Sequence, residues 1–189
     1  MTTGGLDIQD SDKQLLSRLC AGENLVLDML MERHQEPLYN FVLRYIHDEH
    51  LAYDIVQETF VRVYTRATSF NPEYRFKTWL YQIALNLCRD RGRKRALRSF
   101  FSFDEAKEKE AGFTGYDAGI EEKNETKDDI ELLQKEIAKL PHKLKSALIL
   151  FSLEEKSQLE AAEILGVSPK TIETRIYRAK KILKKKIKQ

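Results

Sequence analysis

The stretch that decides the fold runs from Asp54 to Arg95 and holds two helical patterns around a short loop. It reads DIVQETF at 54–60, SFNPEYRF at 69–76, WLYQIALN at 79–86 and RDRGRKR at 89–95. Apolar side chains recur every three or four residues in the first and third segments, which is typical of helices with one buried face. The predicted buried positions are Ala52, Val56, Phe60, Val63, Leu80, Ile83, Ala84, Leu87 and Cys88.

A second stripe on the first of these helices has no evident internal role. Its members recur at i, i+3, i+4 and i+7, and they are Asp54, Gln57, Glu58 and Val61. Because positions with this spacing share a helix face, we expect the stripe to be available to solvent or to a partner.

The loop between the two helices combines aromatic and basic residues. Phe70, Tyr74, Phe76 and Trp79 are interleaved with Arg75 and Lys77. Aromatic rings stack on unpaired bases while cations hold phosphates, so this pattern predicts contact with single-stranded nucleic acid. Core packing is at least as good an explanation for Trp79, and it is the alternative for Phe76.

Charge is distributed in blocks along the chain of 189 residues, although the net charge is only +2. Residues 1–74 have six basic and twelve acidic residues, whereas residues 75–98 have eight and one. Residues 99–129 have four basic and ten acidic residues, and residues 135–189 have fourteen and six. Two basic blocks separated by an acidic spacer predict two contacts with one polyanion, although solvated lysine-rich helices are the simpler alternative.

Several classes of protein are disfavoured. No apolar run is long enough for a membrane span, and the polar N-terminus does not resemble a signal peptide. Cys20 and Cys88 form no paired motif, and His47 and His50 lack further clustered ligands, so no metal or other cofactor is expected. No catalytic set of side chains is visible, which predicts a protein that is not an enzyme.

The C-terminal part has the pattern of a helix–turn–helix unit. Residues 158–165 predict a helix that ends at Gly166, and Ser168 is a predicted N-cap followed by Pro169 at the first helical position. Ile172, Ile176, Ala179 and Leu183 would be buried in the last helix. Its opposite face fits a DNA major groove, and it presents Lys170, Glu173, Thr174, Tyr177, Arg178 and Lys181.

Together these phrases resemble bacterial RNA polymerase sigma factors of the extracytoplasmic-function (ECF) group. Residues 54–60 resemble that family's polymerase-binding helix, and the phrase from Trp79 to Arg93 resembles its promoter-melting helix. Leu140-Pro141, Leu165-Gly166-Val167-Ser168 and Arg178-Ala179 resemble its second DNA-binding domain. The chain departs from the family at Lys145, where arginine is usual, at Ala161, where a larger aliphatic residue is usual, and at Glu173, where a basic residue is common.

The resemblance implies an all-α fold made of two small helical domains on a flexible acidic linker. The expected boundaries are an N-terminal arm at 1–11, a polymerase-binding and −10-element domain at 12–98, a linker at 99–129 and a −35-element domain at 130–189. It also implies a cytoplasmic, non-catalytic protein whose partners are core RNA polymerase, promoter DNA and, in many members of the family, an anti-sigma factor.

The resemblance assigns site residues to three surfaces. The polymerase would meet Asp54, Gln57, Glu58 and Val61. The −10 element would meet Phe70, Asn71, Tyr74, Arg75, Phe76, Lys77, Asn86, Arg89, Arg93 and Arg95. The −35 element would meet Lys170, Thr171, Glu173, Thr174, Arg175, Tyr177, Arg178 and Lys181.

An alternative is a transcription regulator with a helix–turn–helix output domain like that of response regulators. Residues 156–187 would suit both classes of protein. A receiver domain, however, alternates short apolar strands with helices, and no such alternation precedes residue 98.

Overall fold

The computed structural model describes residues 11–101, 125–154 and 156–187, and within these ranges it contains helices and no strand. The prediction of an all-α fold is confirmed. None of the helices in the described ranges has the length and apolar character needed to cross a membrane.

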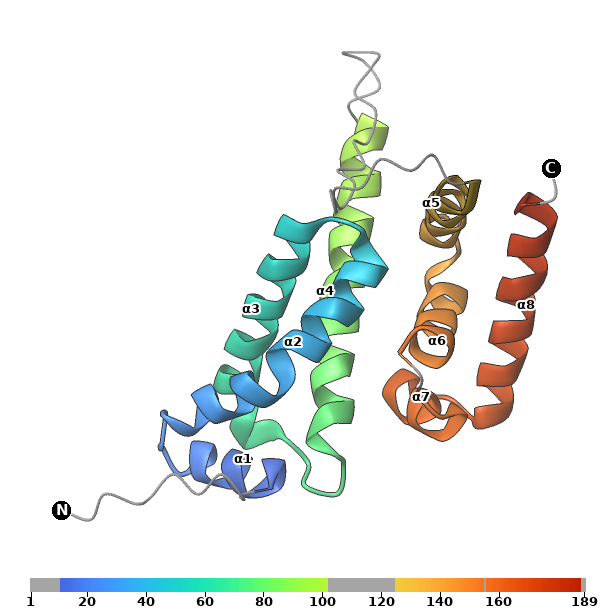
Figure 1. Ribbon diagram of the computed structural model, residues 1–189. Coiled ribbons are helices and arrows are strands. Elements are labelled where there is room, and N and C mark those ends of the chain that lie inside the picture. Colours follow the sequence, from blue (N-terminus) through green and yellow to red (C-terminus); the bar gives the residue numbers. More distant parts are fainter. Residues whose placement is uncertain (1–10, 102–124, 155, 188–189) are drawn as a thin grey trace.

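The first four α-helices form the N-terminal bundle (Figure 1). They are α1 (Asp12–Cys20), α2 (Val26–Ile46), α3 (Glu49–Arg66) and α4 (Phe76–Phe101), with the 3₁₀ turn η1 (Ala67–Ser69) after α3. The core lies between α2, α3 and α4, and Leu30, Phe41, Ile55 and Leu80 are fully buried there. Every apolar position predicted from 52 to 88 is buried as expected.

The other four helices form the C-terminal bundle, beside α4 (Figure 1). They are α5 (Glu125–Ala138), α6 (His142–Ser152), α7 (Gln158–Leu165) and α8 (Pro169–Ile187). Both α4 and α5 extend into the range predicted as linker, while residues 102–124 lie outside the described part. The described side chains exclude 95–101, 125–129 and 131.

Local details at three residues refine what the sequence predicts. Asp12 is a possible N-cap by residue type, but the N-cap of α1 is Ser11, because Gln14 completes a capping box with Ser11 while Asp12 bonds His34 at 2.8 Å. At Pro37 the sequence predicts a kink or a break, and α2 is not broken there, because it is continuous from Val26 to Ile46. The apolar spacing from Ile130 predicts a helix, which α5 confirms, although Ile130 itself is 56% exposed.

The two bundles touch through a junction formed by α2 and α4 on one side and α6 and α7 on the other. Arg44 donates to the backbone oxygen of Leu153 at 2.8 Å. The Tyr45 hydroxyl is hydrogen-bonded to Nδ1 of His142, and the Gln82 amide donates to the backbone oxygen of Glu163 at 3.3 Å. These contacts join residues 81 to 109 positions apart, so they belong to the tertiary structure alone.

Candidate nucleic-acid and partner interfaces

The predicted partner stripe on α3 lies at the surface of the N-terminal bundle. Asp54 and Val61 are exposed, while Gln57 and Glu58 are half-buried. Glu58 accepts from Arg62 one turn later at 2.9 Å, so its charge is partly balanced within α3. Asp54 therefore offers the less compensated carboxylate of the two.

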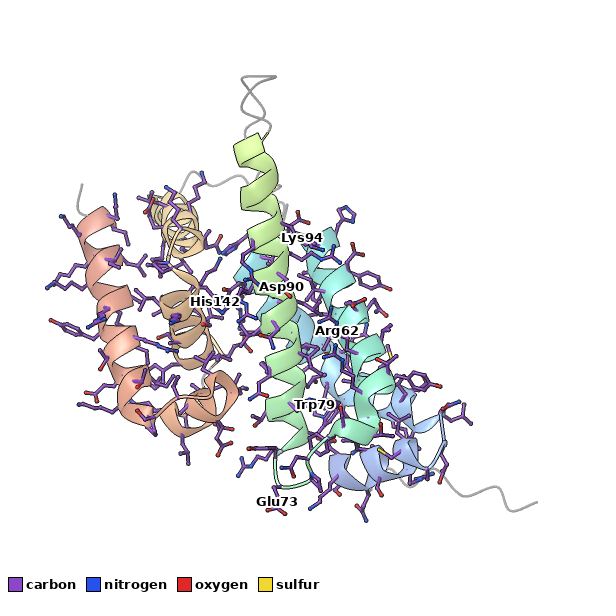
Figure 2. All side chains as sticks on the ribbon, turned by 180° about the vertical axis from the view of Figure 1, so that it is seen from behind. Arg62, Glu73, Trp79, Asp90, Lys94 and His142 are labelled. Atoms are coloured by element: carbon purple, nitrogen blue, oxygen red, sulfur yellow. The ribbon has the colours of Figure 1, made fainter. Side chains whose placement is uncertain are left out.

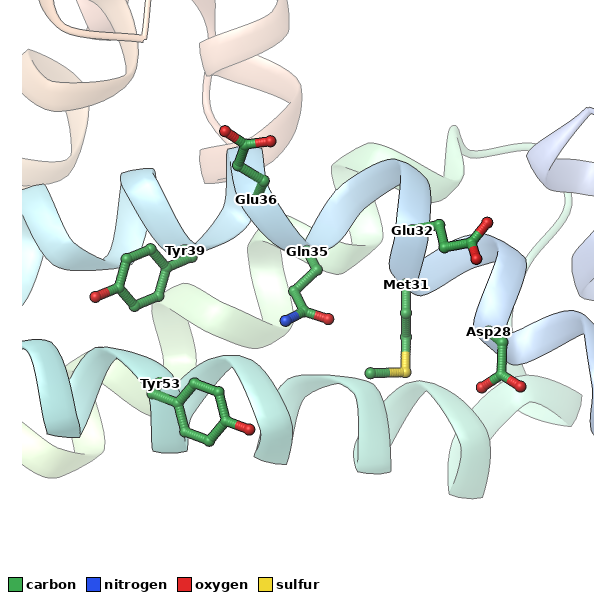
Figure 3. A pocket seen from close by; sticks show the side chains of 7 residues that line it. All are labelled: Asp28, Met31, Glu32, Gln35, Glu36, Tyr39 and Tyr53. Atoms are coloured by element: carbon green, nitrogen blue, oxygen red, sulfur yellow. The ribbon is translucent and has the colours of Figure 1, made fainter.

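A groove of about 610 Å³ between α2 and α3 extends this surface (Figure 3). Met31 and Gln35 point from α2 towards α3, and Tyr53 lies on α3 opposite them. Tyr53, which is 55% exposed, precedes Gln57 by one turn and Val61 by two, so the groove adjoins the predicted stripe. Its acidic rim on α2 consists of Asp28, Glu32 and Glu36.

The groove was missed because the sequence argument considered α3 alone. A signal was nevertheless present, since Asp28, Glu32 and Glu36 recur at i, i+4 and i+8. That spacing places three carboxylates along one face of α2.

The aromatic loop divides into supporting and exposed rings. Phe76 is only 4% exposed and lies 5.3 Å from the His34 ring, so in this conformation it cannot offer its face to a base. Phe70 and Trp79 are half-buried and pack together, with their ring centroids 5.1 Å apart. Tyr74 is 64% exposed, which leaves it as the ring of the loop that is free to stack.

Polar residues of the loop lie close to Tyr74 in sequence and shape the turn. The Asn71 side-chain oxygen accepts from the backbone N–H of Glu73 at 3.0 Å, and its backbone oxygen accepts from Tyr74 at 3.1 Å. Asx turns of this kind fix a tight loop without regular structure. Asn71, Arg75 and Lys77 are all exposed.

Along α4, the loop end is followed by a strongly basic segment. Figure 2 shows Glu73 and Trp79 near one end of this helix and Asp90 and Lys94 farther along it. Asn86, Arg89 and Arg93 are exposed, whereas Arg95 lies among the side chains that are not described. Asp90 accepts from Arg93 at 2.7 Å, and this hydrogen bond lowers the pKa of its carboxyl group.

The helix–turn–helix geometry of α7 and α8 follows from local capping. Ser157 and Glu160 form a capping box at the start of α7, and Gly166 ends that helix with φ = 60°. Ser168 accepts from the backbone N–H of Thr171 at 3.2 Å, as an N-cap does. The predicted buried face of α8 is confirmed, because Ile172, Ile176, Ala179 and Leu183 are all buried.

The opposite face of α8 is open to solvent. The exposed members of the predicted DNA-reading set are Lys170, Glu173, Thr174, Tyr177, Arg178 and Lys181, and Thr171 and Arg175 are half-buried beside them. A carboxylate oxygen of Glu173 lies 2.8 Å from Nζ of Lys170. This ion pair reduces the repulsion between Glu173 and a DNA phosphate. A shallow hollow of about 380 Å³ between α6 and α8 adds Lys143, a cation that the sequence argument missed because it lies on another helix.

Comparisons with known proteins cover both bundles. The family model Sigma-70 region 2 matches residues 30–98, and the model Sigma-70, region 4 matches residues 130–183. The RNA polymerase sigma-H factor of Pseudomonas aeruginosa is 30% identical over 182 residues, covering 94% of each chain. The ECF RNA polymerase sigma factor SigW of Bacillus subtilis is 30% identical over 181 residues, covering 93% of this chain and 96% of SigW.

Among solved structures, one similar to this chain is that of CnrH in complex with the cytosolic domain of CnrY. It has a TM-score of 0.65 at 26% identity, and the match covers 93% of this chain and 96% of CnrH.

Proposed function

The chain belongs to the ECF group of bacterial RNA polymerase sigma factors, and on that premise we propose how its surfaces divide the work of promoter recognition. As a member of this family it is a non-enzymatic initiation factor that binds core RNA polymerase and directs promoter-specific transcription. The response-regulator alternative is not favoured, because residues 30–98 match sigma region 2 and the described part of that region contains helices and no strand.

The polymerase contact is proposed to lie on the α2–α3 face. It would combine the α3 stripe of Asp54, Gln57, Glu58 and Val61 with the acidic groove beside Tyr53. Carboxylates around an apolar floor suit a basic helical surface on the partner, because charge complementarity steers docking while the buried apolar contacts hold it.

The −10 contact is proposed to lie on the aromatic loop and α4. The exposed ring of Tyr74 would stack on an unpaired base, with Asn71 and Asn86 as hydrogen-bonding partners for base edges. Arg75, Lys77, Arg89, Arg93 and Arg95 would hold the backbone. Phe70 and Phe76 would support the loop from beneath, in keeping with their packing on Trp79.

The −35 contact is proposed to lie on α8. The face from Lys170 to Lys181 would enter a major groove with Arg178, Glu173 and Tyr177 towards base edges. Thr171 and Arg175, together with Lys143 of α6, would contact the phosphate backbone.

The observation that carries the proposal is the simultaneous exposure of all three faces on one chain that contains both sigma regions. The test is in vitro transcription with core polymerase purified from the native cell, on a library of promoters from the same cell. Initiation that depends on this protein supports the assignment. A polymerase that binds the protein yet starts at no promoter, or fails to bind it, would contradict it.

Two further properties rest on the relatives. The neighbouring structure of CnrH contains the cytosolic domain of CnrY, which supports proposing a cytoplasmic site of action and an anti-sigma partner for this chain. Affinity purification of the tagged protein from the separated cytoplasmic and membrane fractions of native cells tests both ideas. A partner that competes with core polymerase is the expected result, and recovery of polymerase alone would argue against the anti-sigma partner.

A further inference from the structure

The junction between the two bundles encloses a hollow of about 750 Å³, which shares only Arg89 and Arg93 with the surfaces proposed above. Its cations come from both sides: Arg89, Arg91, Arg93 and Lys94 lie on α4, and Lys145 lies on α6. None of the described residues that line the hollow is Asp or Glu. His142 of α6 also lines the hollow and lies between α6 and α4 (Figure 2).

Lys145 is the most unusual residue of the hollow. It is only 8% exposed, and its ammonium group lies 4.6 Å from the centre of the Tyr45 ring and 3.4 Å from the backbone oxygen of Ala138. No carboxylate among the described residues forms an ion pair with it, although buried lysines are almost always paired. Burial lowers the pKa of Lys145 to about 8, so the group is still mostly charged at neutral pH.

The α4 side of the hollow is also short of negative charge. Asp90 is shared between Arg93 at 2.7 Å and Arg89 at 3.8 Å. Arg91 and Lys94 have no ion pair within the described part of the chain. Cys88, at the same site, cannot supply an anion, because burial raises the pKa of its thiol to about 12.

The surroundings of His142 report the same imbalance. Burial is the largest cause of its lowered pKa. The charges that lower the pKa further are all positive, and they belong to Arg89, Lys145, Arg175 and Arg93. A partly enclosed space lined by one sign of charge concentrates counter-ions. The junction therefore holds a positive field that the described part of the protein does not neutralise.

We propose that this hollow binds a small phosphate-bearing anion, held by Lys145 from the C-terminal bundle and by Arg89 and Arg91 from α4. The guanidinium fork matches phosphate oxygens, and a desolvated ammonium strengthens the pairing. The volume lies within the usual range for small-ligand sites, and the apolar side chains of Ile46 and Leu140 can cover a base or another apolar part of the anion.

Such an anion would affect how the two bundles are arranged, because it contacts both of them. We call the arrangement in which the bundles touch at this junction the closed form, and an arrangement in which they have separated the open form. A ligand that binds only the closed arrangement stabilises it by mass action. A compact chain of this length has a radius of gyration of roughly 16 Å. The −35 and −10 elements lie roughly 85 Å apart along duplex DNA, at about 3.4 Å per base pair. The closed form is too small for its two bundles to contact both promoter elements at once, so the anion would oppose promoter binding. This consequence rests on the proposed function.

The test uses the full-length protein at constant ionic strength, titrated with pyrophosphate, with ATP and with sodium chloride as the reference. Calorimetry should show saturable binding of one anion, and the NMR titration of His142 should show a raised pKa as the positive field is cancelled. Lys145→Gln should weaken binding by roughly tenfold or more, since it removes a charge-assisted bond in a desolvated place. Lys145→Arg should restore most of it.

Lys13→Gln is the matched control, because it makes the same charge change at an exposed position of α1, outside the hollow and outside the proposed binding surfaces. Arg91→Gln, at an exposed position, tests the site even if Lys145→Gln fails to fold. Saturable binding that Lys145→Gln and Arg91→Gln weaken, and Lys13→Gln does not, supports the site for either anion. Equal losses in all variants, or no saturable binding, overturns it. Transcription assays are independent of this result, so the sigma function can stand while the anion site fails.

Discussion

A terminal nitrogen of the Arg44 guanidinium lies 2.5 Å from a side-chain oxygen of Glu154, although the two residues are 110 positions apart. Arg44 is near the end of α2, and Glu154 follows α6, so the ion pair joins the two bundles. The Glu154 side chain is only 8% exposed, whereas that of Arg44 is 47% exposed. The pair therefore differs from an ordinary surface salt bridge in that one partner has lost most of its water.

Removing Arg44 should loosen the junction. Arg44→Ala leaves the carboxylate of Glu154 largely buried without its partner. This is expected to destabilise the closed arrangement by about 1–3 kcal/mol. Small-angle scattering should show a larger radius of gyration, and a cycle of Arg44→Ala, Glu154→Ala and the double variant should reveal coupling. Lys139→Ala is the control, since it breaks the ion pair between Glu136 in the last turn of α5 and Lys139 just after that helix. Additive single effects would show that the pair does not hold the bundles together.

The closed arrangement should weaken in acid. Burial and the surrounding cations lower the pKa of His142 below 6.5, so the closed form binds fewer protons than the open form. The stability contributed by neutral His142 is fully present above about pH 6.5 and is lost as the pH falls through the lowered pKa. The groups around His142 are Tyr45, Arg89, Arg93, Lys145 and Arg175.

Scattering or energy transfer between labelled bundles, recorded from pH 7.5 to about 5.5, measures this effect. His142→Gln should flatten the pH dependence. His47 titrates in the same direction, because burial and Lys145 lower its pKa as well, so His47→Gln is the comparison variant. An unchanged profile in His142→Gln would assign the transition to His47 or to another group.

Charge reversal on α3 should weaken polymerase binding. Asp54→Arg with Glu58→Arg is expected to cost about 1–3 kcal/mol of affinity for core polymerase, because both carboxylates lie on the proposed docking face. Fluorescence titration measures the affinity, and circular dichroism checks that helix content is retained. Glu163→Arg makes a similar charge change on the exposed surface of α7 and should have little effect. Wild-type affinity in the double reversal would remove this face from the proposed contact.

The exposed and buried rings of the loop should behave differently. Tyr74→Ala or Asn86→Ala should reduce open-complex formation on duplex promoters, and the defect should shrink on templates with a pre-melted −10 region, where no unpairing energy is needed. Phe76→Ala should instead lower the melting temperature of the protein, because Phe76 is part of the core. If Tyr74→Ala lost activity equally on both templates, a role in melting would lose its support.

Two groups of residues on α8 should differ in what they recognise. Arg178→Ala should weaken binding to the −35 element by about 1–3 kcal/mol and relax the sequence preference at one base pair of that element. Glu173→Arg should change which −35 sequence is favoured. Replacing Lys184, Lys185 and Lys186 with glutamine should weaken binding to all sequences alike and flatten its salt dependence, because cations beyond the reading turns contact phosphate only. Binding-site selection with holoenzyme separates these outcomes. Unaltered preferences in both single variants would mean that α8 does not read bases.

The helices and the caps of the helix–turn–helix unit could be predicted because they depend on neighbours in sequence. The buried stripe of α8 and the turn at Gly166 and Ser168 were correct, since periodicity and capping act over three or four residues. The family resemblance could be predicted for the same reason, because its phrases are local. The helix around Ile130 was also predicted, but apolar spacing gives a face and does not say whether another element covers it, and Ile130 is 56% exposed.

The site was predicted less completely than the fold. Tyr74 and Phe76 are two residues apart and were both assigned to the −10 contact, with core packing left open for Phe76, yet one is 64% exposed and the other 4%. The α2–α3 groove and Lys143 were missed because each depends on two helices meeting. Residue type alone does not contain that information.

The sequence by itself determined the helical patterns, the basic and acidic blocks and the two regions that identify the family, because these follow from the local chemistry of neighbouring residues. Only the tertiary structure decided that Phe76 supports the loop, that Arg44 meets Glu154 and that Lys145 is buried at the junction without a carboxylate. Burial and pairing at these positions depend on what distant segments bring to them. The free energy of a charged side chain depends on its burial and on the groups around it, and not on its position in the sequence.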